Sequence, residues 1–222
     1  AAGQATQTSR VRRNIRVVAA APITYKGQAQ LQTELANLKA ATAGKPIAEA
    51  FVPAIAPSNI EATIPNEHYP TVEAYLFALA DTMAEEYRAI VDAGFLLQID
   101  DPFLVTYYIT RPDLSLEECR KWCELRVEAL NHALKGLPED RVRYHLCWGS
   151  WHGPHTTDAE LKDIVDVILK VKAPGLSVEA ANPRPAPEYH AREDTKLPDG
   201  PNPTPARIPH HPHGHGHPQR LP

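Results

Sequence analysis

The sequence predicts an α/β fold with a parallel sheet, on three observations. Short apolar runs alternate with long amphipathic segments over residues 15–184. A glycine closely follows three of the amphipathic segments, where a left-handed residue ends a helix: Gly44, Gly94 and Gly136. No apolar run approaches the roughly 20 residues of a membrane-spanning helix. Repeated alternation of strand and helix is typical of parallel strands joined by right-handed crossovers.

The apolar runs are expected to be strands, and the amphipathic segments between them are expected to be helices. The strands fall at 15–24, 49–57, 94–102, 143–150 and 175–180, and the helices at 28–43, 71–93, 115–135 and 157–172. Two of the helices begin with the spacing of a capping box, Ser115 with Glu118 and Thr157 with Glu160. A capping box satisfies amide groups that lack partners in the first turn, so these residues predict where the two helices start.

Polar residues gather where the predicted strands end, which favours a barrel over an open sheet. An open dinucleotide-binding fold usually shows G-x-G-x-x-G after its first strand, and the sequence has no such motif there. A barrel builds its active site at the C-terminal ends of several strands, and a complete one takes about 250 residues. With five recognisable strands and four helices, we expect a partial TIM (β/α)8 barrel whose uncovered sheet edges favour association.

Composition divides the chain into three parts. Residues 1–14 form an N-terminal approach segment, 15–184 the partial barrel, and 185–222 a tail rich in proline and histidine. Half of the 22 prolines fall in the last 40 residues, which predicts disorder there. We also interpret the sequence of the tail as the product of a shifted reading frame, which sequencing of the coding nucleic acid would test. Its histidine tract at 210–217 is interpreted as an adventitious metal binder.

Charge and cysteine content restrict the classes of partner. The formal net charge of −4 gives no indication of nucleic acid or of an anionic membrane surface as a partner. Three cysteines, without a signal peptide, fit a soluble protein of the reducing cytoplasm. Cys119 and Cys123 lie four apart on one predicted helix, where we expect them to be small packing residues rather than metal ligands.

Three potential metal ligands lie on the last two predicted strands. Side chains two residues apart share a face of a strand, so His145 and Cys147 point the same way, as do Ser177 and Glu179. Imidazole, thiolate and carboxylate are the groups that a catalytic zinc uses when it keeps one position open for a substrate. The same H-x-C spacing also fits a buried cysteine beside a hydrogen-bonded histidine.

Four segments in order resemble the cobalamin-independent methionine synthase family, in particular its short single-barrel members, among them relatives of epoxyalkane:coenzyme M transferase. The segments are YKGQAQLQTEL, NEHYPTVEAYLFALADTMAEEYRAIVDAGFLLQIDDPFL, RYHLCWGSWHGPH and GLSVEAANPR. The resemblance covers about residues 17–184. It implies a TIM barrel that enters at about the third strand, leaves after the seventh and so lacks both ends.

The resemblance implies zinc-dependent methyl or alkyl transfer to a thiol. It places the metal ligands on His145, Cys147 and Glu179, and the anchor of the substrate amino group on Asp100. In the synthases the thiol is homocysteine and the donor is a methyltetrahydrofolate. Asp100 shares a strand face with Gln98, so an inward carboxylate also follows from alternation, although a carboxylate that caps a loop amide fits as well.

One departure from the family keeps two further alternatives open. The family has a fourth ligand, a cysteine on its last strand, and this chain has no cysteine after Cys147. A non-catalytic remnant that binds metal weakly is therefore one alternative. The other is a transferase acting on coenzyme M or another small thiol, because the metal ligands would be shared. Neither the thiol nor the alkyl donor follows from the residues.

Overall fold

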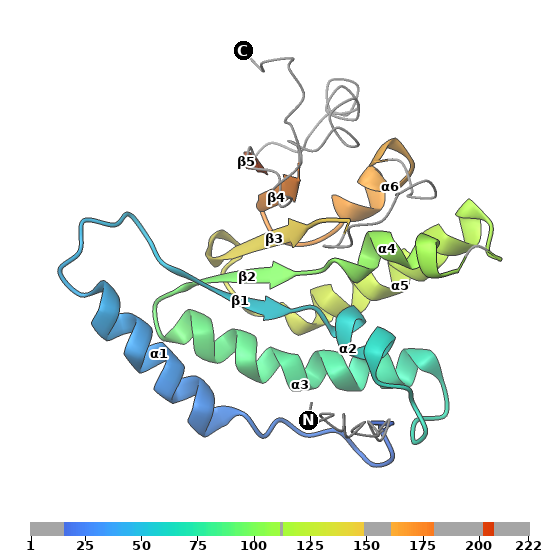
Figure 1. The fold of residues 1–222 in the computed structure, drawn as a ribbon, viewed down its shortest axis with the longest axis horizontal. Helices are drawn as coiled ribbons and strands as arrows, with labels where there is room; N and C mark the ends of the chain where they lie inside the picture. The colour runs from blue at the N-terminus through green and yellow to red at the C-terminus, as the bar shows by residue number, and fades with distance from the viewer. Residues whose placement is uncertain (1–15, 112, 149–160, 180–201, 207–222) are drawn as a thin grey trace, which may run out of the picture.

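A parallel sheet forms the centre of the protein, as the alternating pattern predicts. The structure is a computed structural model that describes residues 16–111, 113–148, 161–179 and 202–206. The strands lie side by side in the order of the chain, and each pairs with the next in parallel (Figure 1). They are β1 Phe51–Ile55, β2 Leu96–Asp100, β3 Val142–Leu146, β4 Gly175–Glu179 and β5 Asn202–Ala206.

Within the described ranges, one helix precedes β1 and the others lie between successive strands from β1 to β4. They are α1 Gln28–Thr42, α2 Pro57–Thr63, α3 Val72–Asp92, α4 Phe103–Thr110, α5 Leu116–Ala133 and α6 Leu161–Ile168, with a 3-10 turn at Glu139–Arg141. The capping box of Ser115 and Glu118 is confirmed at the start of α5, whereas Thr157 and Glu160 lie outside the described residues. Gly44, Gly94 and Gly136 all have positive φ, as expected for residues that end helices. None of the described helices is long and apolar enough to cross a membrane.

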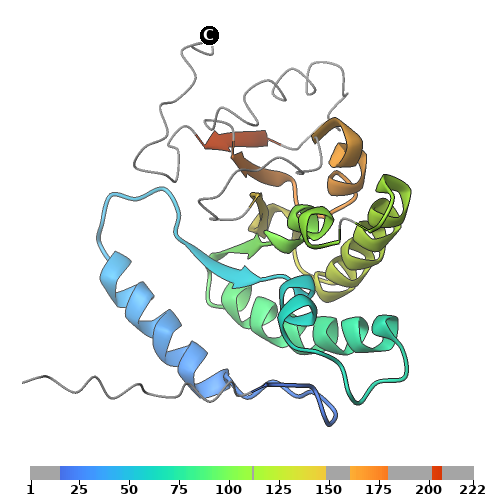
Figure 2. The ribbon, with the colours of Figure 1, turned by 45° about the vertical axis from the view of Figure 1, so that its right-hand side comes forward.

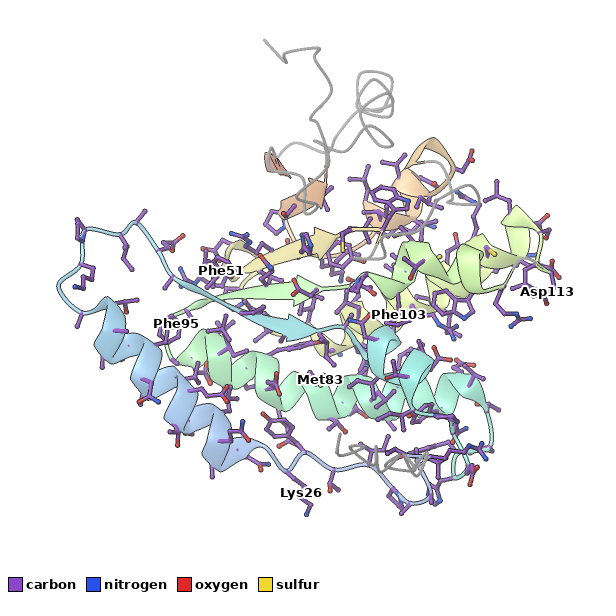
Figure 3. The ribbon with its side chains drawn as sticks, in the orientation of Figure 1. Lys26, Phe51, Met83, Phe95, Phe103 and Asp113 are labelled. Atoms are coloured by element: carbon purple, nitrogen blue, oxygen red, sulfur yellow. The ribbon has the colours of Figure 1, made fainter. Side chains whose placement is uncertain are left out.

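The crossover helices α3, α5 and α6 cover one face of the sheet (Figure 2). The side chains of that face form the main core with the helices, and examples are Leu97, Ile99, Val142, Tyr144 and Leu146. Burial of these apolar side chains is the main force that holds helices and strands together. Met83 and Phe95 are buried in this core, whereas Phe51 on the outermost strand β1 is 43% exposed (Figure 3).

The opposite face of the sheet is not covered by the crossover helices, and it carries polar side chains on β2 and β3 beside the apolar Phe51 and Ile55 of β1. Strand alternation places Gln98 and Asp100 of β2 there, together with Arg143 and His145 of β3. The guanidinium group of Arg143 lies over the ring of Phe51, 4.2 Å from its centroid. Parallel strands in chain order, joined by crossover helices on one face, correspond to part of the wall of a (β/α)8 barrel, so the predicted fold class is confirmed.

The prediction of a strand at 15–24 is wrong. In its described part, 16–24, the segment forms only an isolated bridge, Ala19 with Asn66, in which the Ala19 amide donates to the carbonyl of Pro65 at 2.9 Å. Ala19 packs on Tyr75 and Leu79 of α3, in a small cluster apart from the main core. Ala19 is thus buried against a helix, whereas Val17 is 61% exposed, and an apolar run alone does not distinguish such a segment from a strand of a sheet.

Part of the tail is ordered where the sequence predicted disorder. Asn202–Ala206 form β5, which pairs with β4 from Gly175↔Asn202 to Glu179↔Ala206. Two of its five residues are the prolines Pro203 and Pro205. Proline has no amide hydrogen to donate, so it is accepted in a sheet chiefly at an edge, and β5 is the edge strand here. The histidine tract and the rest of 185–222 lie outside the described residues.

Candidate metal and substrate site

The polar strand ends expected from the sequence lie in one row across the sheet. Asp100 of β2 pairs with His145 of β3, and His145 pairs with Ser177 of β4. Paired residues of parallel strands point to the same face, so these three side chains share the open face near the C-terminal end of the sheet. This is the end at which barrels build their active sites.

His145 and Cys147 are positioned by β3 and the residue that follows it. Both are partly buried, and Nδ1 of His145 lies 3.3 Å from Oγ of Ser177. Leu146 pairs with Val178, so the backbones of Cys147 and Glu179 follow directly on a paired position of the two strands. The side chain of Glu179 lies outside the described part of the chain. Among the described residues no three histidine, cysteine, aspartate or glutamate side chains form a metal-binding group, so the predicted triad stays a prediction.

Asp100 is held through both its side chain and its backbone. Nε2 of Gln98 donates a hydrogen bond of 2.8 Å to its carboxylate. Nδ2 of Asn59, at the start of α2, donates one of 2.8 Å to its carbonyl oxygen, and the amide of Ala56 donates to the same oxygen at 3.0 Å. The carboxylate therefore has a fixed place on the open face, next to His145 in the register.

Asp101 is the residue whose role sequence reasoning missed. It is 2% exposed and lies on the helix-covered side, where its carboxylate accepts hydrogen bonds from Ser58 Oγ at 2.7 Å and Tyr144 Oη at 2.9 Å. Its own amide donates to the carbonyl of His145 at 3.0 Å. Asp101 thus ties the end of β2 to α2 and β3. The pair Asp100–Asp101 is evident in the sequence. Successive residues of a strand point to opposite faces, but the two roles can be assigned only once the end of the strand is known.

Burial raises the pKa values of three ionisable side chains on the helix-covered side of the sheet. Removal from water raises the pKa of Asp101, and the hydrogen bonds from Ser58 and Tyr144 oppose this rise only in part. Burial, with the nearby charge of Asp101 as a second cause, raises the pKa of Tyr144 and of Tyr87. Both phenols are therefore neutral donors at ordinary pH, and the hydroxyl of Tyr87 donates to the carbonyl of Ile55 at 2.7 Å.

The two helix cysteines are packing residues, as expected. Cys119 and Cys123 are both buried, and the thiol of Cys123 donates to the carbonyl of Leu104 at 3.2 Å. Burial raises the pKa of Cys123 to about 12. A thiol is a metal ligand or nucleophile only after losing its proton, so Cys123 is unsuited to either role.

Comparison with known proteins confirms the resemblance found in the sequence. No protein-family model matches the chain. A methionine synthase of Saccharolobus islandicus is 33% identical over 102 residues, which is 45% of this chain and 27% of that protein. Those of Saccharolobus solfataricus and Pyrococcus horikoshii are 32% identical over 109 residues and 28% identical over 102 residues, covering 29% and 26% of the relatives. The matches thus span between a quarter and a third of the relatives' length.

A solved structure supports the fold. The structure of a B12-independent methionine synthase from a Shewanella species, in complex with selenomethionine, aligns with a TM-score of 0.51 and 16% sequence identity. The alignment covers 82% of this chain and 59% of the other. At this identity the likeness concerns the fold alone, and it agrees with a partial barrel.

Proposed function

Because this chain is cobalamin-independent methionine synthase-like over the part that it covers, we propose that its open face holds zinc and activates homocysteine for methyl transfer. The observation that carries the proposal is the row of Asp100, His145 and Ser177, with Cys147 and Glu179 one step further along. A residue that could anchor a substrate and residues that could hold a metal thus come from neighbouring strands at the functional end of the sheet.

The donor set fits zinc. His145, Cys147 and Glu179 would supply nitrogen, sulfur and oxygen, the mixture that zinc accepts in catalytic sites with an open position. The contact between Nδ1 of His145 and Oγ of Ser177 would orient the imidazole, as hydrogen bonds to ligand histidines commonly do. Three protein ligands of this kind would leave a fourth position for the thiol of the substrate.

Zinc, when bound, lowers the pKa of a coordinating thiol and so supplies a thiolate at neutral pH. The protein residues then have two tasks, which are to orient the substrate and to balance its charge. Asp100 would hold the ammonium group of homocysteine, fixed in place by Gln98 and Asn59. Attack of the sulfur on the methyl group of a methyltetrahydrofolate forms the S–C bond, and the C–N bond of the donor breaks with its electron pair left on nitrogen, which takes up a proton.

Metal content of the purified chain tests the proposal. We expect one zinc per chain by elemental analysis, retained after deletion of 207–222 and lost in Cys147→Ala. The matched control is Cys119→Ala, which removes a sulfur from α5 and should keep the metal. Homocysteine should release about one proton on binding to the zinc-loaded chain, measured by calorimetry in buffers of different ionisation enthalpy.

The alternatives predict different results. Metal that disappears with the histidine tract, and is indifferent to Cys147→Ala, would identify a remnant without this site. Tight zinc with preference for coenzyme M over homocysteine would identify a transferase for another small thiol. Synthesis of methionine from homocysteine and a methyltetrahydrofolate tests the full reaction.

A further inference from the structure

Gln98 is a buried amide beside the proposed substrate anchor. It lies in β2 two residues before Asp100, on the same face of the strand, and is only 9% exposed. Its Nε2 donates to Oδ1 of Asp100 at 2.8 Å. Because an ionised carboxylate can only accept hydrogen bonds, this contact fixes which end of the amide is the NH2 group. Oε1 is therefore the atom that points away from Asp100.

Oε1 of Gln98 has no hydrogen-bond partner in the described part of the chain. Buried acceptors are nearly always satisfied in native proteins, so an exception needs an explanation, and a group of a bound ligand that donates to it is one. Of the four buried side-chain atoms that lack a partner within the described ranges, a second is Oδ1 of Asn59. Asn59 also directs its NH2 group at Asp100, through the carbonyl oxygen of that residue. Two of the unsatisfied acceptors thus belong to amide side chains that donate to Asp100, one to its carboxylate and one to its backbone carbonyl.

A carboxylate next to an amide oxygen is suited to a ligand that brings positive charge and several N–H donors. A primary ammonium group has three such donors and no acceptor. A sulfonate or a second carboxylate would instead bring acceptors toward acceptors and negative charge toward Asp100. The chemistry of these groups thus favours an amino thiol over a thiol without an amino group.

We infer that Gln98 is a specificity-determining residue whose Oε1 accepts a hydrogen bond from the ammonium group of an amino-thiol substrate. Its Nε2 at the same time orients Asp100, which balances the charge. The inference rests on the proposed function and extends it to a residue outside the metal site. Asp100 is in register with His145 on the next strand. Neighbouring strands lie about 4.8 Å apart, a distance that a short amino thiol can bridge between ammonium and sulfur.

The test compares two thiols that differ only in the ammonium group, L-homocysteine and 4-mercaptobutanoic acid, by calorimetric titration of the zinc-loaded chain. The wild-type chain should bind homocysteine at least ten-fold more tightly. Gln98→Met keeps the length of the side chain and removes both polar atoms. Its affinity for homocysteine should fall about ten-fold, the effect of one lost hydrogen bond to a charged group, with the affinity for 4-mercaptobutanoic acid unchanged. Gln30→Met, on the exposed side of α1, is the matched control and should alter neither affinity.

A second variant covers a failure of Gln98→Met to fold. Gln98→Leu also removes both polar atoms and should lose the preference for homocysteine in the same way. Equal binding of the two thiols by the wild-type chain, or an unchanged preference in Gln98→Met or Gln98→Leu, would overturn the inference while leaving zinc-dependent thiol binding intact. Failure of both thiols to bind the zinc-loaded wild-type chain would instead overturn the proposed function, and this inference with it.

Discussion

Breaking the buried ion pair between Glu61 and Arg126 should destabilise the protein far more than breaking an exposed pair. Nη2 of Arg126 lies 2.9 Å from Oε1 of Glu61, and the two side chains are 3% and 16% exposed. The pair joins α2 to α5, and its guanidinium group also lies 3.9 Å from the ring centroid of Trp122. Because α2 also carries Ser58 and Asn59, the pair supports the segment that holds Asp101 and Asp100.

The magnitude follows from burial. Glu61→Ala leaves the guanidinium group of Arg126 buried without its counter-ion, and losing one partner of a buried pair costs about 3–5 kcal/mol. Glu61 retains some contact with water, so we expect the lower end, about 3 kcal/mol. For a chain of this size, at about 2–4 °C for each kcal/mol, the midpoint of thermal unfolding should fall by about 6–12 °C. Urea unfolding followed by circular dichroism measures the free energy directly.

Two further variants make the reasoning refutable. Glu117→Ala breaks a pair with Lys121 whose side chains are 78% and 70% exposed, and it should change the free energy of unfolding far less than Glu61→Ala does, because water screens exposed charges. The double variant Glu61→Leu with Arg126→Met removes both charges and should recover most of the lost stability, because no buried charge is left unpaired. A cost for Glu61→Ala similar to that of Glu117→Ala, or a double variant as unstable as the sum of its single variants, would refute the explanation.

Three other predictions concern groups in or beneath the sheet. Burial raises the pKa of Asp101 in the folded protein. The contribution of Asp101 to stability is therefore complete below its pKa in the unfolded chain, near 3.9, and is lost as pH rises through its folded pKa. The stability advantage of wild type over Asp101→Asn, measured in urea, should shrink from pH 4 to pH 7, and an advantage that grows would contradict this. With its pKa raised to about 12, Cys123 should resist iodoacetamide at pH 8 in the folded protein, and rapid alkylation mapped to it by mass spectrometry would contradict its burial. A Cβ added at Gly175 would lie 3.0 Å from Cβ of Arg143, which must then give by a few tenths of an ångström. Gly175→Ala should therefore cost about 1–3 kcal/mol and weaken zinc binding. Unchanged stability and zinc affinity would show that the strands adapt freely.

Helices with strong local signals were predictable almost to the residue. Ser115 and Glu118 predict the start of α5 because a capping box is a local interaction, complete within four residues. The short helices α2 and α4 were missed because their signals are weak. Pro57 at the first helical position is the only start signal of α2. The sequence of α4, FLVTYYIT, is rich in β-branched and aromatic residues that favour strands.

The candidate site, too, was only partly predictable from local patterns. Alternation along a strand placed Asp100 with Gln98, and His145 with Cys147, on common faces, because the backbone fixes side-chain direction with a period of two. The register that brings Asp100 beside His145, and His145 beside Ser177, joins strands 32 to 45 residues apart in the chain. The alternating pattern restricts which face of each strand is buried, but which residues of distant strands pair is decided only when the segments pack together.

By itself the sequence determined the alternation of strands and helices, the glycines that end helices and the residue types available for metal and substrate, because each depends on neighbours within about one turn. Only the tertiary structure decided that 16–24 packs on α3 rather than in the sheet, that Asp101 lies buried beneath Asp100, and that Oε1 of Gln98 has no partner among the described residues. These facts depend on burial, and burial is set by segments distant in the chain that compete for the same apolar surface.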